Sequence, residues 1–197
     1  MPHPDADNNA VTNPIQAHSP GRRVLSKCDI AHALRRIAHE IIDHNKEAGG
    51  LVILGIPTRG DALAHRLVGL LAEVKDSDVF VGSLDVTMYR DDLRRQPTRT
   101  AGHTMIPVSG IDDKVVVLVD DVLYSGRTVR AALDALGDFG RPRAVRLAVL
   151  VDRGHRELPI RTDHVGKHLP TTKSERVRVC LAEEDGSEEV RIVGRES

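Results

Sequence analysis

The chain has 197 residues, of which 40% are hydrophobic, 29% are charged and 2% are aromatic. This length and composition indicate one globular domain with an aliphatic core rather than a disordered protein. The formal net charge of −1 excludes a nucleic-acid-binding field over the whole surface, so that such a surface would have to be a local patch.

The first 23 residues differ in composition from the rest of the chain. They are rich in Pro, Asn, Asp and His, show no hydrophobic periodicity and lack the apolar stretch of a secretory signal. No later apolar run approaches the length of a membrane span, and Cys28 and Cys180 belong to no metal-binding or disulfide pattern. We therefore expect a disordered N-terminal tail over residues 1–23 and a single domain over residues 24–197, in a cytoplasmic protein.

A helix is predicted at the start of this domain. The pattern S-x-x-D at Ser26–Asp29 is typical of a capping box, and apolar residues follow it at helical spacing from Ile30 to Ile42. Gly49 and Gly50 are expected to end the helix. The face of this helix opposite the apolar residues carries several Arg and His side chains.

Apolar strands and amphipathic helices then alternate along the chain. This alternation predicts an α/β fold with a doubly wound, mostly parallel sheet. Two later and more polar segments, 175–183 and 188–194, are expected to be strands at an antiparallel edge. The apolar strands are expected at 51–56, 79–89, 115–119 and 144–151, and the helices at 63–74 and 129–136.

Several loops are predicted to meet at one edge of the sheet. Because ligands of such sheets bind beyond the carboxyl ends of the strands, the segments 55–60, 120–128 and 151–158 should lie together around a ligand. Residues 90–112 are polar and interrupted by Pro and Gly. Such a stretch is long for a structureless loop in a compact domain, so we expect it to be a functional flap.

The sequence YSGRT follows a predicted strand and opens a predicted helix. Backbone N–H groups and the helix dipole favour phosphate at this position, Gly126 allows close approach of the backbone, and Ser125 and Thr128 can donate hydrogen bonds. Arg127 either adds charge or points to solvent. The segment matches neither the P-loop nor the dinucleotide-binding pattern. Taken alone, it is equally compatible with an ordinary strand–turn–helix junction.

Two adjacent carboxylates, Asp120 and Asp121, precede this segment. At the end of a strand they can accept hydrogen bonds from the 2- and 3-hydroxyls of a ribose. They can also stabilise the positive charge that develops at the anomeric carbon of a sugar when a leaving group departs. The pair therefore favours a ligand that is both a polyol and a phosphate.

The segment VVLVDDVLYSGRT resembles the phosphoribosyl-diphosphate (PRPP) motif of the phosphoribosyltransferase fold. Further segments resemble the PyrR family, whose members are bifunctional pyrimidine operon regulators and uracil phosphoribosyltransferases. The resemblance covers roughly residues 24–193, and it implies a small hood domain and a flexible active-site flap beside the parallel sheet. It is carried by TMYRDDL (87–93), residues 120–136, LAVLVDRGHRELPIR (147–161) and HVGKHLPTTKSERVRV (164–179).

The resemblance also implies the roles of individual residues. Asp120 and Asp121 would hold the ribose, and together with Arg59 they would be the catalytic residues. Mg²⁺ would be carried by PRPP near the two aspartates, without direct ligands from the protein. The remaining contacts to PRPP, uracil and the product UMP would be made by Thr58, Arg59, Gly60, Arg99, Val122, Leu123, Tyr124, Ser125, Gly126, Arg127, Thr128, Arg153 and Val177.

A second function, binding of the leader mRNA of pyrimidine genes, is implied by the same resemblance. The basic side chains opposite the apolar face of the first helix are otherwise interpreted as a solvated surface. Arg35 and His44 stand where the family commonly has other residue types. The protein is expected to be a homodimer or a larger homo-oligomer, with no membrane partner. The residues implied in RNA binding are Arg35, Arg36, His39, Arg161 and Lys167.

Two other functions remain open from the sequence. One is an RNA-binding regulator that uses the nucleotide pocket only as a sensor of UMP, with negligible catalysis. The other is a phosphoribosyltransferase for a base other than uracil, because no side chain in the sequence identifies the base.

Overall fold

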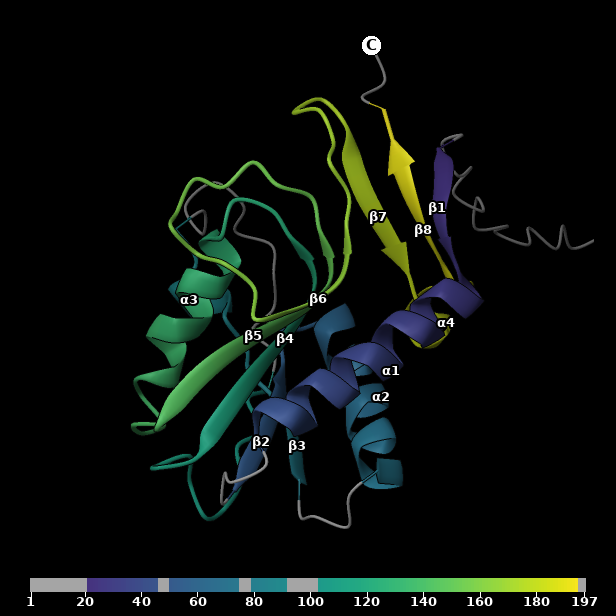
Figure 1. The fold of residues 1–197 in the computed structure, drawn as a ribbon. Helices are drawn as coiled ribbons and strands as arrows, with labels where there is room; N and C mark the ends of the chain where they lie inside the picture. Colours follow the sequence, from purple (N-terminus) through teal and green to yellow (C-terminus); the bar gives the residue numbers. More distant parts are fainter. Residues whose placement is uncertain (1–20, 46–49, 75–78, 92–102, 195–197) are drawn as a thin grey trace, which may run out of the picture.

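The computed structural model describes residues 21–45, 50–74, 79–91 and 103–194. A five-stranded parallel sheet with the strand order β3-β2-β4-β5-β6 forms its centre (Figure 1). This arrangement confirms the predicted doubly wound α/β fold. The strands are β2 (Leu51–Gly55), β3 (Val79–Ser83), β4 (Val115–Leu123), β5 (Ala144–Asp152) and β6 (His164–His168).

Helices cover both faces of this sheet, and each face has its own apolar core (Figure 1). Helices α1 (Lys27–His44) and α2 (Arg59–Val74) pack on one face, where Ile37, Leu63 and Val117 are fully buried. Helix α3 (Arg127–Leu136) covers the other face. The core is aliphatic, as the composition predicts, and it fixes the direction of the strand ends that carry the polar loops.

A second, smaller sheet forms the hood, which comprises β1 (Arg22–Ser26), β8 (Glu189–Val193) and β7 (Arg176–Cys180) in this antiparallel order. Its apolar side packs with α1 and α2 through residues such as Val179 and Val190. The 3₁₀ helix η1 (Thr87–Tyr89) and the single-turn helix α4 (Ala182–Asp185) complete the described elements.

The structure corrects several predicted boundaries. The strand expected at 79–89 ends at Ser83, because η1 follows it. The two late strands belong to the hood, where β8 pairs with β1 and β7 pairs with β8, and they do not extend the main sheet. Strand β6 was not predicted, and β1 begins at Arg22, within the segment expected to be a tail. Residues 1–20 lie outside the described residues, so the expected disorder of that segment is not addressed.

The predicted N-terminus of α1 is confirmed. Ser26 Oγ accepts a hydrogen bond from the backbone N–H of Asp29, and the Asp29 carboxylate accepts one from the backbone N–H of Ser26 at 2.8 Å. The helix ends at His44, before the glycines expected to stop it, and Asn45 caps it by donating its side-chain amide to the carbonyl of Ile41. Within the described ranges, no helix is both long and apolar enough to cross a membrane.

The predicted flap lies largely outside the described residues, which omit 92–102 and therefore Arg99. The described part, from residue 103 on, is attached to the end of β3. Met105 forms an isolated antiparallel bridge with Ser83, and Thr104 Oγ1 accepts a hydrogen bond from the backbone N–H of Asp85. The start of the second half of the predicted flap is thus anchored to the end of β3 and to the residues that follow it.

Candidate active site

A cavity of about 320 Å³ opens at the carboxyl end of β4, beside the N-terminus of α3. Strand β4 continues through Asp120 and Asp121 to Leu123, four residues beyond Val119, the last residue of the apolar run. The cavity thus joins the predicted phosphate segment to one member of the acid pair. It is lined by Arg90, Asp91, Asp120, residues 122–129 and Glu157.

The N-terminus of α3 forms the floor of this cavity. Gly126 precedes the helix with φ +92°, a left-handed conformation that favours glycine. A Cβ atom at this position would also lie 3.4 Å from Leu158 and Ile160. The first-turn N–H groups of a helix have no partners within the helix and carry partial positive charge, so this junction is suited to an anion.

Arg127 lies at the mouth of the cavity and does not point freely to solvent. Its Nε donates a hydrogen bond to Glu157 Oε2 at 2.7 Å, and its Nη1 donates one to Asp91 Oδ2. The guanidinium therefore holds together two acidic residues from loops that are distant in sequence. Its charge therefore lies at the cavity and is paired with two carboxylates, while the side chain remains 49% exposed to solvent.

The two aspartates differ in their surroundings. Asp120 is 8% exposed and accepts a hydrogen bond at Oδ1 from the backbone N–H of Asp121 at 2.9 Å. Burial, and then the charge of Asp121, raise the pKa of Asp120 well above its ordinary value. Asp121 is half-buried, and its Oδ1 accepts from the N–H of Val122. A buried carboxylate beside another carboxylate is stabilised by a cation or by hydroxyl donors.

The loop between β2 and α2 carries the predicted diphosphate residues. The backbone at Gly60 lies against β4, because a Cβ atom there would stand 2.4 Å from the carbonyl oxygen of Val119. Thr58 is exposed next to it. The guanidinium of Arg59 is held in a two-pronged pair with Asp185 of α4, with Nη2–Oδ1 at 2.7 Å and Nε–Oδ2 at 3.1 Å. The sequence analysis did not anticipate this partner.

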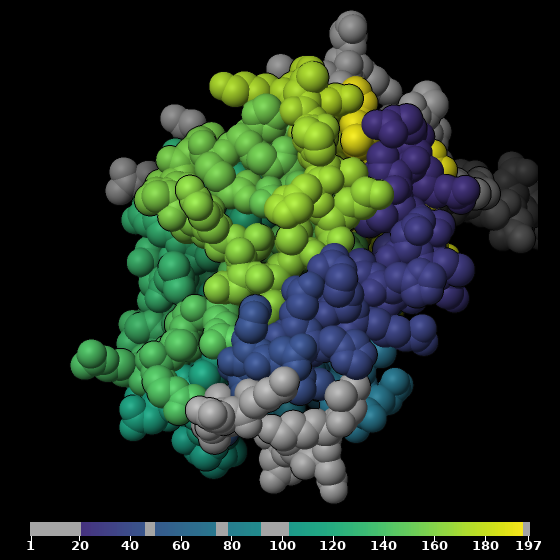
Figure 2. All heavy atoms as spheres, in the orientation of Figure 1, coloured from purple at the N-terminus to yellow at the C-terminus, as the bar shows by residue number. Residues whose placement is uncertain are grey.

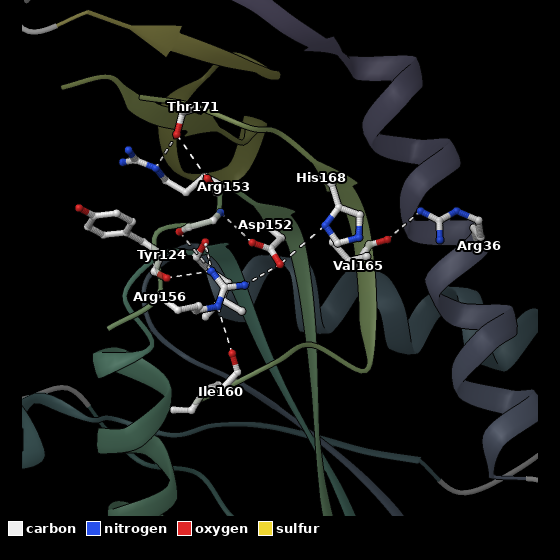
Figure 3. A network of polar contacts seen from close by, with 11 residues as sticks. Arg36, Tyr124, Asp152, Arg153, Arg156, Ile160, Val165, His168 and Thr171 are labelled. Atoms are coloured by element: carbon white, nitrogen blue, oxygen red, sulfur yellow. Dashed lines mark hydrogen bonds and ion pairs between the residues drawn. The ribbon is translucent and has the colours of Figure 1, made fainter. Parts of the chain in front are cut away.

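Arg153 is buried and stacks on Tyr124, with its guanidinium carbon 4.3 Å from the ring centroid (Figure 3). Its Nη2 donates to the carbonyls of Thr172 and Glu175 at 3.0 and 2.8 Å. Arg153 therefore ties the end of β5 to the segment that leads into β7. The partly buried Val177 lies two residues beyond this contact.

A second network extends from the cavity to the outer strand β6 (Figure 3). Arg156 Nη1 donates to the carbonyl of Tyr124 at 2.8 Å, and its Nη2 donates to Asp152 Oδ2 at 2.5 Å. The same carboxylate oxygen lies 3.7 Å from Nδ1 of His168, whose side chain is 70% exposed. Although burial raises it, the hydrogen bonds from Arg156 and Gly154 hold the pKa of Asp152 below its ordinary value.

The residues implied in RNA binding are all exposed, but they lie on different parts of the surface. In Figure 2, helix α1 (blue-violet) lies beside the yellow-green segment that contains β6. Arg36 donates to the carbonyls of Val165 and Gly166 in β6, next to Lys167. Arg35 instead lines a groove between α1 and α2, on the other side of the helix.

Arg161 lies near the β6 side of this surface. It lines an open cavity of about 830 Å³ together with Val165 and His168. His39 is exposed on α1, one turn from Arg36. The basic residues of the predicted helix face therefore have different surroundings. Arg36 is hydrogen-bonded to the backbone of β6, whereas Arg35 lines the groove between α1 and α2.

Four residues of the site were missed by the sequence analysis: Arg90, Asp91, Glu157 and Asp185. The first two lie within the segment TMYRDDL, so this motif was noted without being assigned to the cavity. Glu157 lies in the predicted loop 151–158 at the same edge of the sheet. Asp185 carries no signal in the sequence, since its pairing with Arg59 joins segments 126 residues apart.

The fold and the site together define the class of protein. The family model of the phosphoribosyl transferase domain matches residues 23–184. A hypoxanthine phosphoribosyltransferase from Staphylococcus aureus is similar in fold, with a TM-score of 0.65 and 18% identity, covering 94% of this chain and 98% of that one. The hypoxanthine phosphoribosyltransferase of Trypanosoma cruzi is also similar in fold, with a TM-score of 0.67 and 16% identity. The match covers 89% of this chain and 97% of that one. The chain is a phosphoribosyltransferase-fold protein.

Relatives with higher sequence identity are named bifunctional protein PyrR. The relative from Streptomyces coelicolor is 63% identical over 171 residues, which cover 87% of this chain and 89% of the relative. The relative from Leifsonia xyli is 60% identical, and the match covers 87% of this chain and 96% of the relative. The relative from Mycobacterium tuberculosis is 55% identical, and the match covers 87% of this chain and 92% of the relative. The chain belongs to the PyrR family, as the resemblance implied.

Proposed function

We propose that this protein is a uracil phosphoribosyltransferase, which converts uracil and PRPP into UMP and diphosphate, and that it also regulates pyrimidine genes by binding their leader mRNA when a uridine nucleotide is bound. The observation that carries the enzymatic part is the position of Asp120 and Asp121 beside the anion-binding N-terminus of α3. Membership of the PyrR family supports both parts.

In the proposed reaction, N1 of uracil forms a bond to C1 of the ribose while the bond from C1 to the diphosphate oxygen breaks, and the N1 proton is released. The two aspartates accept hydrogen bonds from the ribose hydroxyls and stabilise the positive charge that develops at C1. The segment 123–128 binds the 5′-phosphate through the N–H groups at the start of α3. Thr58, Arg59 and Gly60 bind the departing diphosphate.

We propose Mg²⁺ as the cation of the reaction. Mg²⁺ prefers oxygen ligands and keeps several waters, and when bound it would neutralise charge on the diphosphate. Among the described residues, no group of three or more His, Cys, Asp or Glu side chains could hold a metal ion. We propose that PRPP carries the ion into the site, with Asp120 and Asp121 beside it. The raised pKa of Asp120 agrees, because burial without a cation disfavours its charged form.

The base is proposed to bind near Tyr124, Arg153 and Val177. The stacked pair of Tyr124 and Arg153 presents a flat surface beside the cavity, and two N–H groups of Arg153 are already used by Thr171 Oγ1 and by backbone carbonyls. Selection of uracil then rests on backbone groups of the segment that Arg153 holds in place.

The substrate is tested by measuring turnover with PRPP and each of uracil, orotate, hypoxanthine and guanine, in the presence of Mg²⁺. We expect rapid nucleotide formation with uracil, and rates lower by more than about 10² with the purines, because a site that pairs with one base leaves its polar groups unpaired with another. Faster turnover of another base would contradict the proposed substrate.

RNA binding is tested by titrating pyrimidine leader RNA with and without UMP at two salt concentrations. We expect UMP to tighten binding. Exchange of Lys167 for Ala should lower the salt slope by about 0.7–0.9 if this residue contacts one phosphate. Lys173, an exposed lysine in the turn before β7, provides the matched control. RNA binding without turnover of any base would instead favour the alternative of a regulator that only senses UMP.

A further inference from the structure

The guanidinium proposed to bind diphosphate is already paired with a carboxylate of the protein. Two N–H groups of Arg59 donate to the two oxygens of Asp185, at 2.7 and 3.1 Å. A guanidinium fork binds carboxylate and phosphate oxygens with the same geometry. Asp185 and a diphosphate group would therefore compete for the same two donors.

The carboxylate of Asp185 is held in place independently of Arg59. Its Oδ2 also accepts a hydrogen bond from the backbone N–H of Leu181 at 2.9 Å. The hydrogen bond from Arg59, and further the backbone N–H of Leu181 and the charges of Arg59 and Arg178, hold the pKa of Asp185 below its ordinary value although burial opposes this. Asp185 thus remains an anion at neutral pH and keeps its position when the arginine turns away.

The backbone next to Arg59 lies against β4, the strand that carries the acid pair. The next residue, Gly60, approaches the carbonyl oxygen of Val119 so closely that a side chain has no room there. Val119 directly precedes Asp120, so the backbone of Arg59 is fixed beside the acid pair while its side chain, 33% exposed, can change partner.

We infer that Asp185 acts as an internal substitute for diphosphate, which occupies Arg59 between turnovers, yields it to the diphosphate group of PRPP and reclaims it as the product leaves. This inference rests on the proposed role of Arg59 in binding diphosphate. Asp185 is then a positioning residue, which lowers the affinity for PRPP and for product diphosphate alike and so limits product retention.

The test is the exchange D185N, which keeps an oxygen for the N–H of Leu181 and removes the competing charge. We expect the KM for PRPP and the Kd of magnesium diphosphate, measured by calorimetry, each to fall roughly two- to fivefold, the range of partly exposed ion pairs. The KM for uracil should stay unchanged. Loss of order in the hood would weaken binding of both substrates, so it cannot produce a gain in diphosphate affinity.

The matched control is E183Q. Glu183 lies on the same short helix but pairs with Arg66 of α2, at 2.6 Å. Its exchange should leave both diphosphate constants unchanged. A third variant, R59Q, separates the inference from the proposed function on which it rests.

If R59Q leaves the KM for PRPP unchanged, the proposed diphosphate site fails and the inference fails with it. If R59Q raises this KM and D185N leaves it unchanged or raises it, only the inference is overturned. A similar gain in both D185N and E183Q would also overturn it, because the effect would then come from the overall charge of α4.

Discussion

Asp120 combines a functional position with an energetic cost to the folded state. Its carboxyl group is buried beside Asp121, and this burial raises its pKa well above the ordinary value of 3.8. A carboxyl group whose pKa is raised on folding binds its proton more tightly in the folded state. The free energy of unfolding therefore falls as the pH rises from the unfolded pKa through the folded one, and the cost is fully present once both forms are ionised.

Exchange of Asp120 for Asn should consequently separate activity from stability. Asn keeps an oxygen for the N–H of Asp121 but carries no charge to stabilise the sugar cation, so turnover should fall by about 10²–10³. The free energy of unfolding at pH 7, measured by urea titration, should be equal to that of the wild type or higher. A variant that turns over within a few-fold of the wild type, or that is less stable, would contradict this role.

At the scale of elements, the contact between α1 and β6 contains a buried histidine. His164 is fully buried, its Nδ1 lies 3.4 Å from Glu40 Oε2, and its ring lies 5.2 Å from that of His44. Its Nε2 has no hydrogen-bond partner among the described residues. Burial lowers the pKa of His164 below its ordinary value, although Glu40 opposes this. The neutral form therefore stabilises the folded protein.

This contact should weaken in acid. Because the pKa of His164 is lowered on folding, its contribution to stability is present above the unfolded value of about 6.5 and is lost as the pH falls below it, with a slope of at most about 1.4 kcal/mol per pH unit. Unfolding free energies at several pH values between 7.5 and 5.5 should show a smaller slope for H164Q than for the wild type. Exchange of the exposed His103 for Gln should leave the slope unchanged.

The elements that could be predicted are those whose own sequence specifies them. The apolar runs of β2, β4 and β5, the helical spacing in α1 and the capping box at Ser26 are local signals. Strand β6 reads HVGKH, which is short, partly polar and free of strong strand formers apart from one valine, and it lies at the edge of the sheet. Its pairing with β5, which no local pattern encodes, makes it a strand.

The candidate site, too, was predictable only where its residues follow one another in the sequence. The segment 120–128 is contiguous, so the sequence alone places an acid pair directly before the predicted phosphate segment. The partner of Arg59 and the bridge from Arg127 to Asp91 and Glu157 depend on contacts between distant segments. Charged residues are common on the surface, and only the folded chain determines which of them pair.

At the scale of the whole molecule, one polar network connects the cavity proposed to bind the nucleotide with the face that carries the basic residues. Arg156 joins the carbonyl of Tyr124 to Asp152, and Asp152 lies near His168 of β6. The neighbouring residue of that strand, Lys167, is one of the residues proposed to bind RNA. If segment 123–128 binds the nucleotide phosphate as proposed, the network would give a physical route by which the bound nucleotide favours one arrangement of β6.

We expect D152N to reduce the effect of UMP on RNA affinity. Asn keeps an acceptor for the N–H of Gly154 but loses the charge that pairs with Arg156 and lies 3.7 Å from His168. Turnover and RNA affinity without UMP should change little, while the ratio of RNA affinities with and without UMP should move towards one. By linkage, the effect of RNA on UMP affinity should fall by the same factor, which a UMP titration with bound RNA measures. An unchanged ratio would exclude this route.

The hood joins segments that are made at very different times. Arg22 of β1 pairs with Ile192 of β8, about 170 residues later, so at a synthesis rate of roughly 5–20 residues per second β1 waits about 10–30 s for its partner strand. Until then a nascent chain presents an unpaired strand edge. It also lacks Asp185, so Arg59 has no internal carboxylate to hold it. A polypeptide still attached to the ribosome therefore exposes an arginine, proposed to bind diphosphate, that is paired with Asp185 in the finished protein.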